Sequence, residues 1–207
     1  MSTYFITGIG TEIGKTIASA IVTETLQADY WKPIQAGDLD NSDTHKVQNL
    51  ISNENTIFHP NSFSLNTPMS PHAAAEIDGV KMTSKNINRP KSTNRNMVIE
   101  GAGGLLVPIS DNEVIADLIS PEDNVLVVSR HYLGSINHTL LTLEALRSRG
   151  LHIAGIIFNG EKKESTESII LKMSGVPCVG RIDVEPYFDK NVIKEYAEKF
   201  KESLKGL

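Results

Sequence analysis

The chain has 207 residues, of which 40% are hydrophobic and 22% charged, and its formal net charge is −5 at pH 7. This size and composition fit one globular domain covering residues 1–207, and the negative charge disfavours nucleic acid or an anionic membrane as a partner. No apolar run approaches the roughly 20 residues that a transmembrane helix needs.

The first element is an apolar, β-branched and aromatic run over residues 3–8, which predicts a buried strand. A glycine-bearing loop follows, and Gly14, Lys15 and Thr16 begin an apolar-periodic helix. In such a loop, backbone N–H groups and the helix dipole face phosphate oxygens, lysine neutralises the β- and γ-phosphates, and threonine can ligate Mg²⁺. An ordinary glycine-rich turn is the alternative, but the Gly-Lys-Thr context favours a nucleoside-triphosphate site.

The next segments alternate between short ordered runs and polar loops. Residues 29–34 predict a second strand that continues into the acidic loop 35–44, and a helix is expected to begin near residue 43. Ser70 and Pro71 predict the start of a helix through residues 73–75. Residues 81–96 carry five Lys or Arg and no acid; a nucleic-acid patch is possible there, but a solvated helix and loop is favoured because aromatic residues are missing.

The second half has a regular rhythm. Three nearly continuous apolar runs, at residues 97–100, 124–129 and 151–158, start 27 residues apart and predict strands covered on both faces. A clear helical pattern covers 135–149, and a short strand at 176–180 precedes a C-terminal amphipathic helix. This spacing predicts an α/β fold: a mostly parallel sheet with helices on both faces, a three-layer sandwich of the P-loop NTPase type.

Cysteine use and the N-terminus bear on the compartment. Cys178 is the only cysteine, so an internal disulfide is excluded, and we expect its side chain to be a small buried hydrophobic group. The first strand begins almost at the N-terminus, where a signal peptide is therefore not expected. These features predict a cytoplasmic protein.

Ligands of parallel α/β sheets bind beyond the carboxyl ends of the strands, so the residues at these ends are candidate site residues. Thr16, Glu100 and one aspartate from residues 38–43 could supply the hard oxygen ligands that Mg²⁺ prefers. A solvated strand-end acid is the alternative for Glu100, and its apolar neighbours disfavour it. Lys32 could lie on the surface or could neutralise charge on a transferred group, and its local pattern does not decide between these.

Six motifs, taken together and in order, resemble the dethiobiotin synthetase family. They are residues 7–16 with five rather than four residues between Gly8 and Gly14, Lys32-Pro33, Asn41-Ser42-Asp43, Ser70-Pro71-His72, residues 100–104 and residues 133–138. The resemblance covers residues 3 to about 185. It implies a cytoplasmic ligase of biotin biosynthesis that uses ATP, Mg²⁺ and CO₂ or bicarbonate to close a ureido ring on 7,8-diaminononanoate. The expected course is a carbamate, then a carbamic-phosphoric anhydride, and finally dethiobiotin, ADP and phosphate.

The resemblance also implies roles for individual residues. The expected nucleotide contacts are Glu12, Ile13, Gly14, Lys15, Thr16, Ile17, Asp43, Glu100, Gly101, Ala102, Gly103, Asn159, Gly160, Asp183, Val184 and Glu185. The expected metal ligands are Thr16, Asp43 and Glu100, and the expected catalytic residues are Lys32, Lys15 and Thr11. The expected substrate contacts are Lys32, Ala36, Ser135, Ile136 and Asn137, the last three across a homodimer interface.

Two positions depart from the family pattern. Ala36 replaces a usual Ser or Thr, so a hydroxyl contact to the substrate is missing or is supplied by a neighbour such as Gln35. Asp183 replaces a proline, which affects the expected contacts to the base.

Three other functions are weighed against this one. A nucleotide-switched ATPase of the partitioning or maturation type shares the loop but usually carries an early lysine in it, where this chain has Ile9, Gly10 and Thr11. An amidotransferase synthetase of the cobyrinic-acid type needs a further glutaminase domain. A non-enzymatic binding module does not explain why lysines and potential Mg²⁺ ligands converge on one cleft.

Overall fold

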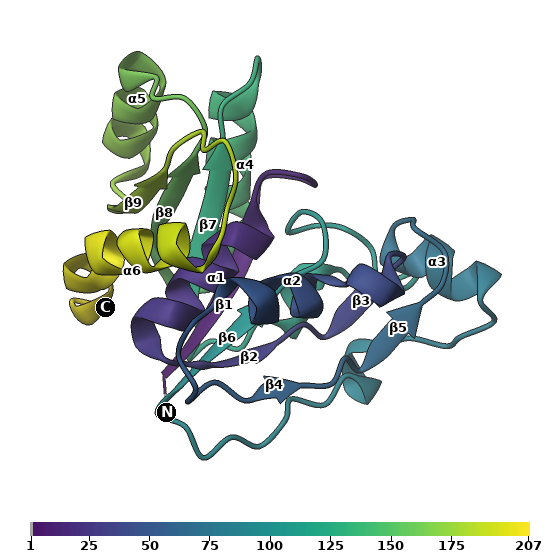
Figure 1. Cartoon of the computed structure of the whole chain (residues 1–207). Helices are drawn as coiled ribbons and strands as arrows, with labels where there is room; N and C mark the ends of the chain where they lie inside the picture. The colour runs from purple at the N-terminus through teal and green to yellow at the C-terminus, as the bar shows by residue number, and fades with distance from the viewer. Residues whose placement is uncertain (1) are drawn as a thin grey trace.

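The computed structural model describes residues 2–207, and its centre is a seven-stranded sheet with the order β4-β2-β6-β1-β7-β8-β9 (Figure 1). Every strand pair in this sheet is parallel. Strands β3 and β5 form a separate parallel pair beside it. The strands are β1 (Ser2–Gly8), β2 (Asp29–Trp31), β3 (Ile34–Ala36), β4 (Phe58–His59), β5 (Phe63–Leu65), β6 (Asn96–Glu100), β7 (Asn124–Arg130), β8 (Ile153–Asn159) and β9 (Cys178–Ile182).

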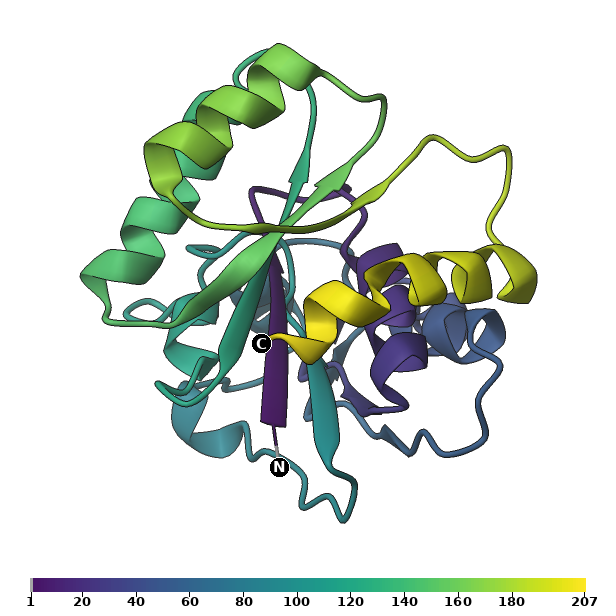
Figure 2. The same cartoon turned by 90° about the vertical axis from the view of Figure 1, so that its left-hand side faces the viewer.

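Helices cover both faces of the main sheet, as Figure 2 shows in side view. They are α1 (Lys15–Leu26), α2 (Asp43–Leu50), α3 (Pro71–Ile77), α4 (Ser135–Ser148), α5 (Glu164–Ser174) and α6 (Lys190–Lys205), with 3₁₀ turns at Leu39–Asn41, Ser84–Asn86 and Ile115–Leu118. Helices α1, α2 and α6 pack on one face, and α4 and α5 pack on the other.

The central strand explains why both faces are covered. Successive side chains of a strand point to opposite faces, and in β1 Phe5 belongs to one hydrophobic core while Ile6 belongs to the other. Both side chains are fully buried. The nearly continuous apolar runs of the sequence therefore correspond to strands buried on both faces, and the predicted three-layer α/β fold is confirmed.

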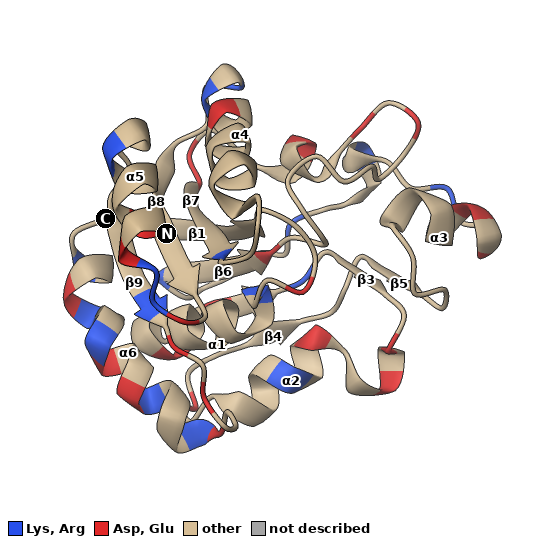
Figure 3. Ribbon diagram, turned by 90° about the horizontal axis from the view of Figure 1, so that it is seen from above, with Lys and Arg blue, Asp and Glu red and all other residues tan. Residues whose placement is uncertain are grey.

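Helix α6 shows the opposite pattern, because only one of its faces is buried. Ile193, Tyr196 and Phe200 lie in the core, while Lys and Glu side chains alternate on the outer face (Figure 3). This is the amphipathic spacing expected of a surface helix. The Asp189 side chain caps the helix by accepting hydrogen bonds from two backbone N–H groups of the first turn.

Three local predictions were wrong in detail. The strand predicted over 29–34 ends at Trp31, and β3 resumes at Ile34 in the other sheet, because Pro33 has no N–H to donate to a sheet ladder. The last strand spans Cys178–Ile182 rather than 176–180, and Cys178 is exposed rather than buried.

A fourth prediction was also wrong in detail: residues 81–95 form a loop with a single 3₁₀ turn and no α-helix, and Asn96 begins β6. Arg89 anchors this loop by donating hydrogen bonds to the Asp123 carboxylate and to the Leu118 carbonyl. Met82 and Ile87 are buried against the core, so the loop is held by specific contacts and by packing. Within residues 2–207, no helix combines the length and apolarity that crossing a membrane requires.

Candidate active site

The loop between β1 and α1 has the backbone of a phosphate-binding loop. Gly14, just before the helix, has φ +93°, a value that L side chains rarely adopt, and a Cβ there would overlap the amide of Asn159. Glu12 adopts a positive φ of 56°. Gly14 therefore permits both the turn of the loop and the close approach of Asn159, the last residue of β8, to the loop.

Lys15 is folded back over this loop. Its ammonium donates a hydrogen bond of 2.9 Å to the Gly10 carbonyl, and its side chain is buried. Burial lowers the pKa of Lys15 to about 8, with the neighbouring Lys32 acting in the same direction and Glu100 and Asp43 opposing it. Lys15 is therefore mostly protonated at pH 7, and a phosphate group could replace the Gly10 carbonyl as its partner.

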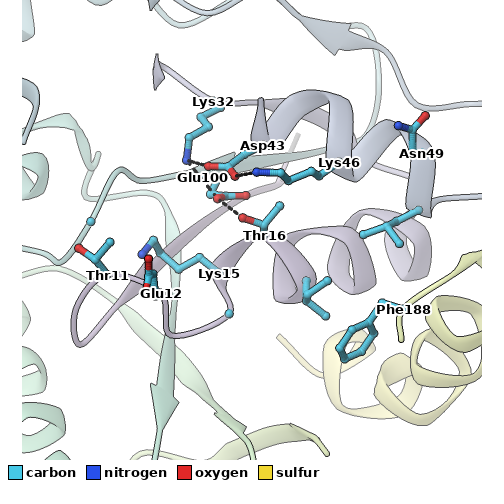
Figure 4. Close-up of a pocket in the computed structure, with 14 residues that line it drawn as sticks. Thr11, Glu12, Lys15, Thr16, Lys32, Asp43, Lys46, Asn49, Glu100 and Phe188 are labelled. Atoms are coloured by element: carbon cyan, nitrogen blue, oxygen red, sulfur yellow. Dashed lines mark hydrogen bonds and ion pairs between the residues drawn. The ribbon is translucent and has the colours of Figure 1, made fainter. Parts of the chain in front are cut away.

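A buried ion cluster lies beside the loop, built from three elements (Figure 4). Lys32 follows β2, Asp43 is the first residue of α2, and Glu100 ends β6. The Lys32 ammonium is 2.8 Å from an Asp43 carboxylate oxygen and 3.1 Å from a Glu100 oxygen. Lys32 is 3% exposed and Glu100 1% exposed, so the surface interpretations of both residues were wrong.

Burial and charge act in opposite directions on this cluster. Burial alone would lower the pKa of Lys32, but Glu100 and Asp43 outweigh it and raise that pKa. Burial alone would raise the pKa of Asp43, but Lys32 and, to a lesser degree, Lys46 lower it. Lys32 and Asp43 thus favour their charged forms at neutral pH, which places an ion pair next to the phosphate-binding loop.

Glu100 is fixed by donors on both of its oxygens. Thr16 donates to Oε1 at 3.1 Å, and Tyr30 donates to Oε2 at 2.9 Å. Tyr30 is fully buried on β2, and burial together with the charge of Glu100 raises the pKa of its hydroxyl well above its ordinary value. The carboxylate therefore has one orientation, with Oε1 facing the start of α1.

This donor set fits Mg²⁺ better than a transition metal. Among residues 2–207, no group of three or more His, Cys, Asp and Glu side chains is arranged to hold a metal ion. Thr16, Asp43 and Glu100 instead offer one hydroxyl and two carboxylates, and Mg²⁺ commonly binds through one or two carboxylates and completes its shell with water and phosphate. Asp43 is the aspartate of the acidic loop that takes part, while Asp38 and Asp40 lie outside the ion cluster.

These residues line one pocket of about 640 Å³. Its walls are Thr11, Glu12, Gly14, Lys15, Thr16, Ile17, Lys32, Asp43, Lys46, Asn49, Leu50, Glu100, Gly103 and Phe188. Four of them, Lys46, Asn49, Leu50 and Phe188, are not among the sequence candidates. Lys46 lies three residues after Asp43 on α2, a spacing that places both on one helix face and could have indicated it.

The glycine-rich segment after β6 packs against the phosphate loop. The Gly101 N–H donates to the Ile6 carbonyl at 3.0 Å, and Gly103 has φ +66°. A Cβ at Gly103 would lie 3.5 Å from the Thr11 hydroxyl. The segment that contains Ala102 thus lies close to β1 in space, and Gly103 is part of the pocket wall.

The candidates for base recognition lie at the ends of β8 and β9. Asn159 donates from Nδ2 to the Ile13 carbonyl at 2.8 Å, which ties β8 to the phosphate loop. The Gly160 N–H donates to the Ile182 carbonyl at 2.8 Å. Beyond β9, the Tyr196 hydroxyl accepts from the Asp183 N–H and donates to the Glu185 carboxylate.

Several candidates do not line the pocket described above. Ile13, Gly101, Ala102, Asn159, Gly160, Asp183, Val184 and Glu185 lie outside its walls, and so does Ala36 on β3. Ser135, Ile136 and Asn137, at the start of α4, line a separate hollow of about 690 Å³. Within one chain, the two hollows share no lining residue.

The chain is similar to known proteins over nearly its whole length. A family model described as an AAA domain matches residues 2–192. A protein of Christiangramia forsetii named ATP-dependent dethiobiotin synthetase BioD is 66% identical over 201 residues, which is 97% of each chain. A protein of the same name from Cytophaga hutchinsonii is 46% identical over 200 residues, covering 96% of this chain and 97% of the other.

Solved structures give the fold. The cell division ATPase MinD of Pyrococcus furiosus matches with a TM-score of 0.62, covering 98% of this chain and 99% of that one at 13% identity. At this identity the likeness shows the fold alone, and it confirms the predicted P-loop NTPase type of sheet.

Proposed function

Since the chain belongs to the ATP-dependent dethiobiotin synthetase family, we propose that its phosphate-loop pocket is where ATP activates a carbamate of 7,8-diaminononanoate. The chain is a ligase that makes dethiobiotin in biotin biosynthesis at the expense of ATP. One observation carries the assignment of the pocket: Lys32 is buried and paired with two carboxylates beside the loop that holds Lys15.

The chemistry needs two anions to approach each other. One substrate amine adds to CO₂ and loses a proton to give a carbamate, whose oxygen attacks the γ-phosphorus of ATP while the bond to the β-phosphate oxygen breaks. The second amine then attacks the carbonyl carbon, and phosphate leaves with the former carbamate oxygen. Lys15 neutralises the transferred phosphoryl group and Lys32 faces the carbamate, so that positive charge lies where negative charges meet.

Thr16, Asp43 and Glu100 would hold the Mg²⁺ that accompanies ATP. Bound to the phosphates, Mg²⁺ would offset their charge and orient them for in-line transfer. The hydrogen bond from Tyr30 keeps Glu100 in position for this role. Thr11 lines the same pocket on the side of the segment with Gly103, where we place it among the groups that contact the reacting phosphate.

Residues at the ends of β8 and β9 would contact the base. Because the Asn159 amide N–H is used by the Ile13 carbonyl, its Oδ1 is the atom free to accept a hydrogen bond from a base amine. The segment with Asp183, Val184 and Glu185 follows at the same edge of the sheet, next to Gly160. This arrangement supports adenine recognition through residues 159–160 and 183–185.

We also propose that the protein is a homodimer in which Ser135, Ile136 and Asn137 contact the substrate bound by the other subunit. The support is that these residues line a hollow separate from the phosphate-loop pocket of their own chain. Leu133 and Leu141, beside and on α4, are highly exposed apolar side chains that a partner could cover. Changing Leu133 to Asp should shift the mass measured by light scattering from two chains to one, and a wild-type monomer would contradict the dimer.

Ala36 lies in β3 without a hydroxyl to offer, and Gln35 does not fill that role from its present position. The Gln35 side chain donates to the Gly37 carbonyl and accepts from the Asp43 N–H, so it supports the start of α2 instead.

We propose that residues 1–207 work as one domain, since one main sheet carries all the strand ends of the site. A cytoplasmic location stays our expectation, because ATP and bicarbonate are available there.

The test is ring formation by the purified protein. With diaminononanoate, bicarbonate, ATP and Mg²⁺, we expect dethiobiotin, ADP and phosphate in equal amounts. Started with fresh ¹⁸O-labelled CO₂, the reaction should transfer one label to phosphate, because phosphate leaves with the carbamate oxygen. Substrate-independent ATP hydrolysis without ring product would instead indicate a switch ATPase of the partitioning type.

A further inference from the structure

Lys46 is a cation of the pocket wall to which the chemistry above gives no role. It extends from the first turns of α2 toward Asp43 (Figure 4). Its ammonium lies 2.8 Å from a carboxylate oxygen of Asp38 and 3.8 Å from Oδ1 of Asp43. Its side chain is 38% exposed, so it lies at the open side of the pocket rather than in the buried cluster.

The two lysines beside Asp43 hold different oxygens. Lys32 is 2.8 Å from Oδ2, while Lys46 is 3.8 Å from Oδ1. The Oδ1 atom is therefore held less tightly and is the one that can turn to a metal ion. If Oδ1 of Asp43 turns to a metal ion, the Lys46 ammonium keeps only Asp38 as a carboxylate partner. The Asp38 side chain is largely exposed, so water and salt weaken its attraction for the ammonium.

A count of charges shows what the pocket lacks without Lys46. Lys15 and Lys32 contribute two formal positive charges, and Glu12, Asp43 and Glu100 contribute three formal negative charges, so without Lys46 the wall has a formal charge of −1. Mg·ATP and a carbamate together bring further negative charge to this negative set. Lys46 brings the formal charge of the wall to zero, and its side chain is 38% exposed, so it is accessible to a ligand.

We infer that Lys46 is a third phosphate-binding cation, which leaves Asp38 and Asp43 when Mg·ATP binds and pairs with the terminal phosphate. The inference rests on the proposed ATP site and adds to it a residue that selects ATP over ADP. Lys46 lies on the same helix face as Asp43, the proposed metal ligand, and its long side chain can exchange a carboxylate for a phosphate oxygen by rotating about its own bonds.

The alternative is that Lys46 only holds the loop at residues 37–42 through its ion pair with Asp38. The two roles predict opposite results for Asp38→Asn. If the ion pair with Asp38 is what matters, this variant should weaken nucleotide binding as much as Lys46→Met does. If Lys46 binds phosphate, Asp38→Asn removes a competitor and should leave ATP binding unchanged or tighter.

The experiment is titration calorimetry with Mg·ATP and Mg·ADP, without diaminononanoate, on the full chain. For Lys46→Met we expect the Kd for ATP to rise about tenfold, as for loss of one partly exposed charge-assisted hydrogen bond, with the Kd for ADP changing less than about twofold. Lys46→Arg should restore most of the preference for ATP. Gln48→Met, an exposed position of the same helix, is the matched control and should bind as wild type. Thermal unfolding checks that each variant is folded.

An ATP-to-ADP affinity ratio that Lys46→Met leaves unchanged would overturn the inference, and so would an equal loss in Asp38→Asn. These outcomes are separate from the fate of the proposed reaction. If the wild type binds ATP but forms no dethiobiotin, the reaction assignment fails, whereas an ATP-specific loss in Lys46→Met still supports the phosphate-binding role.

Discussion

The ammonium of Lys32 lies 3.1 Å from a carboxylate oxygen of Glu100, although 68 positions separate the two residues in the chain. Both are almost fully buried, and parallel strands β2 and β6 run side by side to bring them together. Burying two charges costs solvation energy that the ion pair at best repays, so stability alone gives a weak reason to keep them. The need to bind anionic ligands at this site is a better reason for keeping the two charges buried.

Removing the Lys32 charge should stop ring formation while ATP still binds. For Lys32→Met we expect kcat for dethiobiotin to fall at least about 100-fold, because the carbamate loses its counter-charge where it meets the γ-phosphate. The variant should also lose about 3 kcal/mol of unfolding free energy, since Glu100 is left with one cation fewer in a buried site. Product assay and urea denaturation measure the two effects, and wild-type turnover would exclude Lys32 from the reaction.

Lys15→Ala should largely abolish turnover with the fold intact. The Lys15 ammonium lies over the phosphate loop and bonds only a carbonyl of that loop, so its removal leaves no buried charge without a partner. We expect kcat to fall at least about 100-fold, as for loss of a cation that acts on the transferred phosphoryl group. Circular dichroism should match that of the wild type, and an unchanged rate would remove Lys15 from the mechanism.

Tyr30→Phe tests whether the orientation of Glu100 matters. The substitution removes the hydroxyl that donates to Glu100 Oε2 at 2.9 Å and keeps the buried ring. We expect a loss of about 1–2 kcal/mol in unfolding free energy, because a buried carboxylate oxygen loses its donor. The Mg²⁺ concentration needed for half-maximal rate should rise. Tyr187→Phe, at an exposed position, is the control and should change neither quantity.

The start of β2 gives a prediction for acid pH. Asp29 is buried and accepts hydrogen bonds from Ser92, the Ile57 N–H, His59 and Asn94. Burial alone would raise the pKa of Asp29, but these hydrogen bonds outweigh it and lower that pKa. A pKa below the unfolded value of about 3.9 means that Asp29 stabilises the fold above that pH and ceases to do so as pH falls through the lowered folded-state pKa.

The comparison of wild type with Asp29→Asn checks this prediction. At pH 7 the variant should be about 1–3 kcal/mol less stable to urea, since a charged acceptor of several hydrogen bonds is lost. The difference should shrink progressively as pH is lowered from about 5 toward 2, because the wild-type carboxylate is then protonated as well. A difference that is constant with pH would show that the charge of Asp29 contributes nothing.

Local sequence determined the elements that depend on contiguous residues. The strand, glycine loop and helix at residues 3–16 could be predicted because β-propensity, positive-φ glycine and helical periodicity act within a few positions. The same holds for the repeated apolar runs, whose continuity requires strands covered on both faces. The family motifs added a set of candidate residues whose roles stay predictions.

Only the tertiary structure decided which side chains meet. The sequence alone could not choose between the surface and the site for Lys32, and it could not show that Cys178 is exposed or that Lys46 lines the pocket. It offered Asp38, Asp40 and Asp43 as equivalent acids until the family motif favoured Asp43, and packing of α2 against α1 and α6 brought that one to Lys32. Side-chain burial and ion pairing depend on neighbours tens of residues away, and no local propensity encodes them.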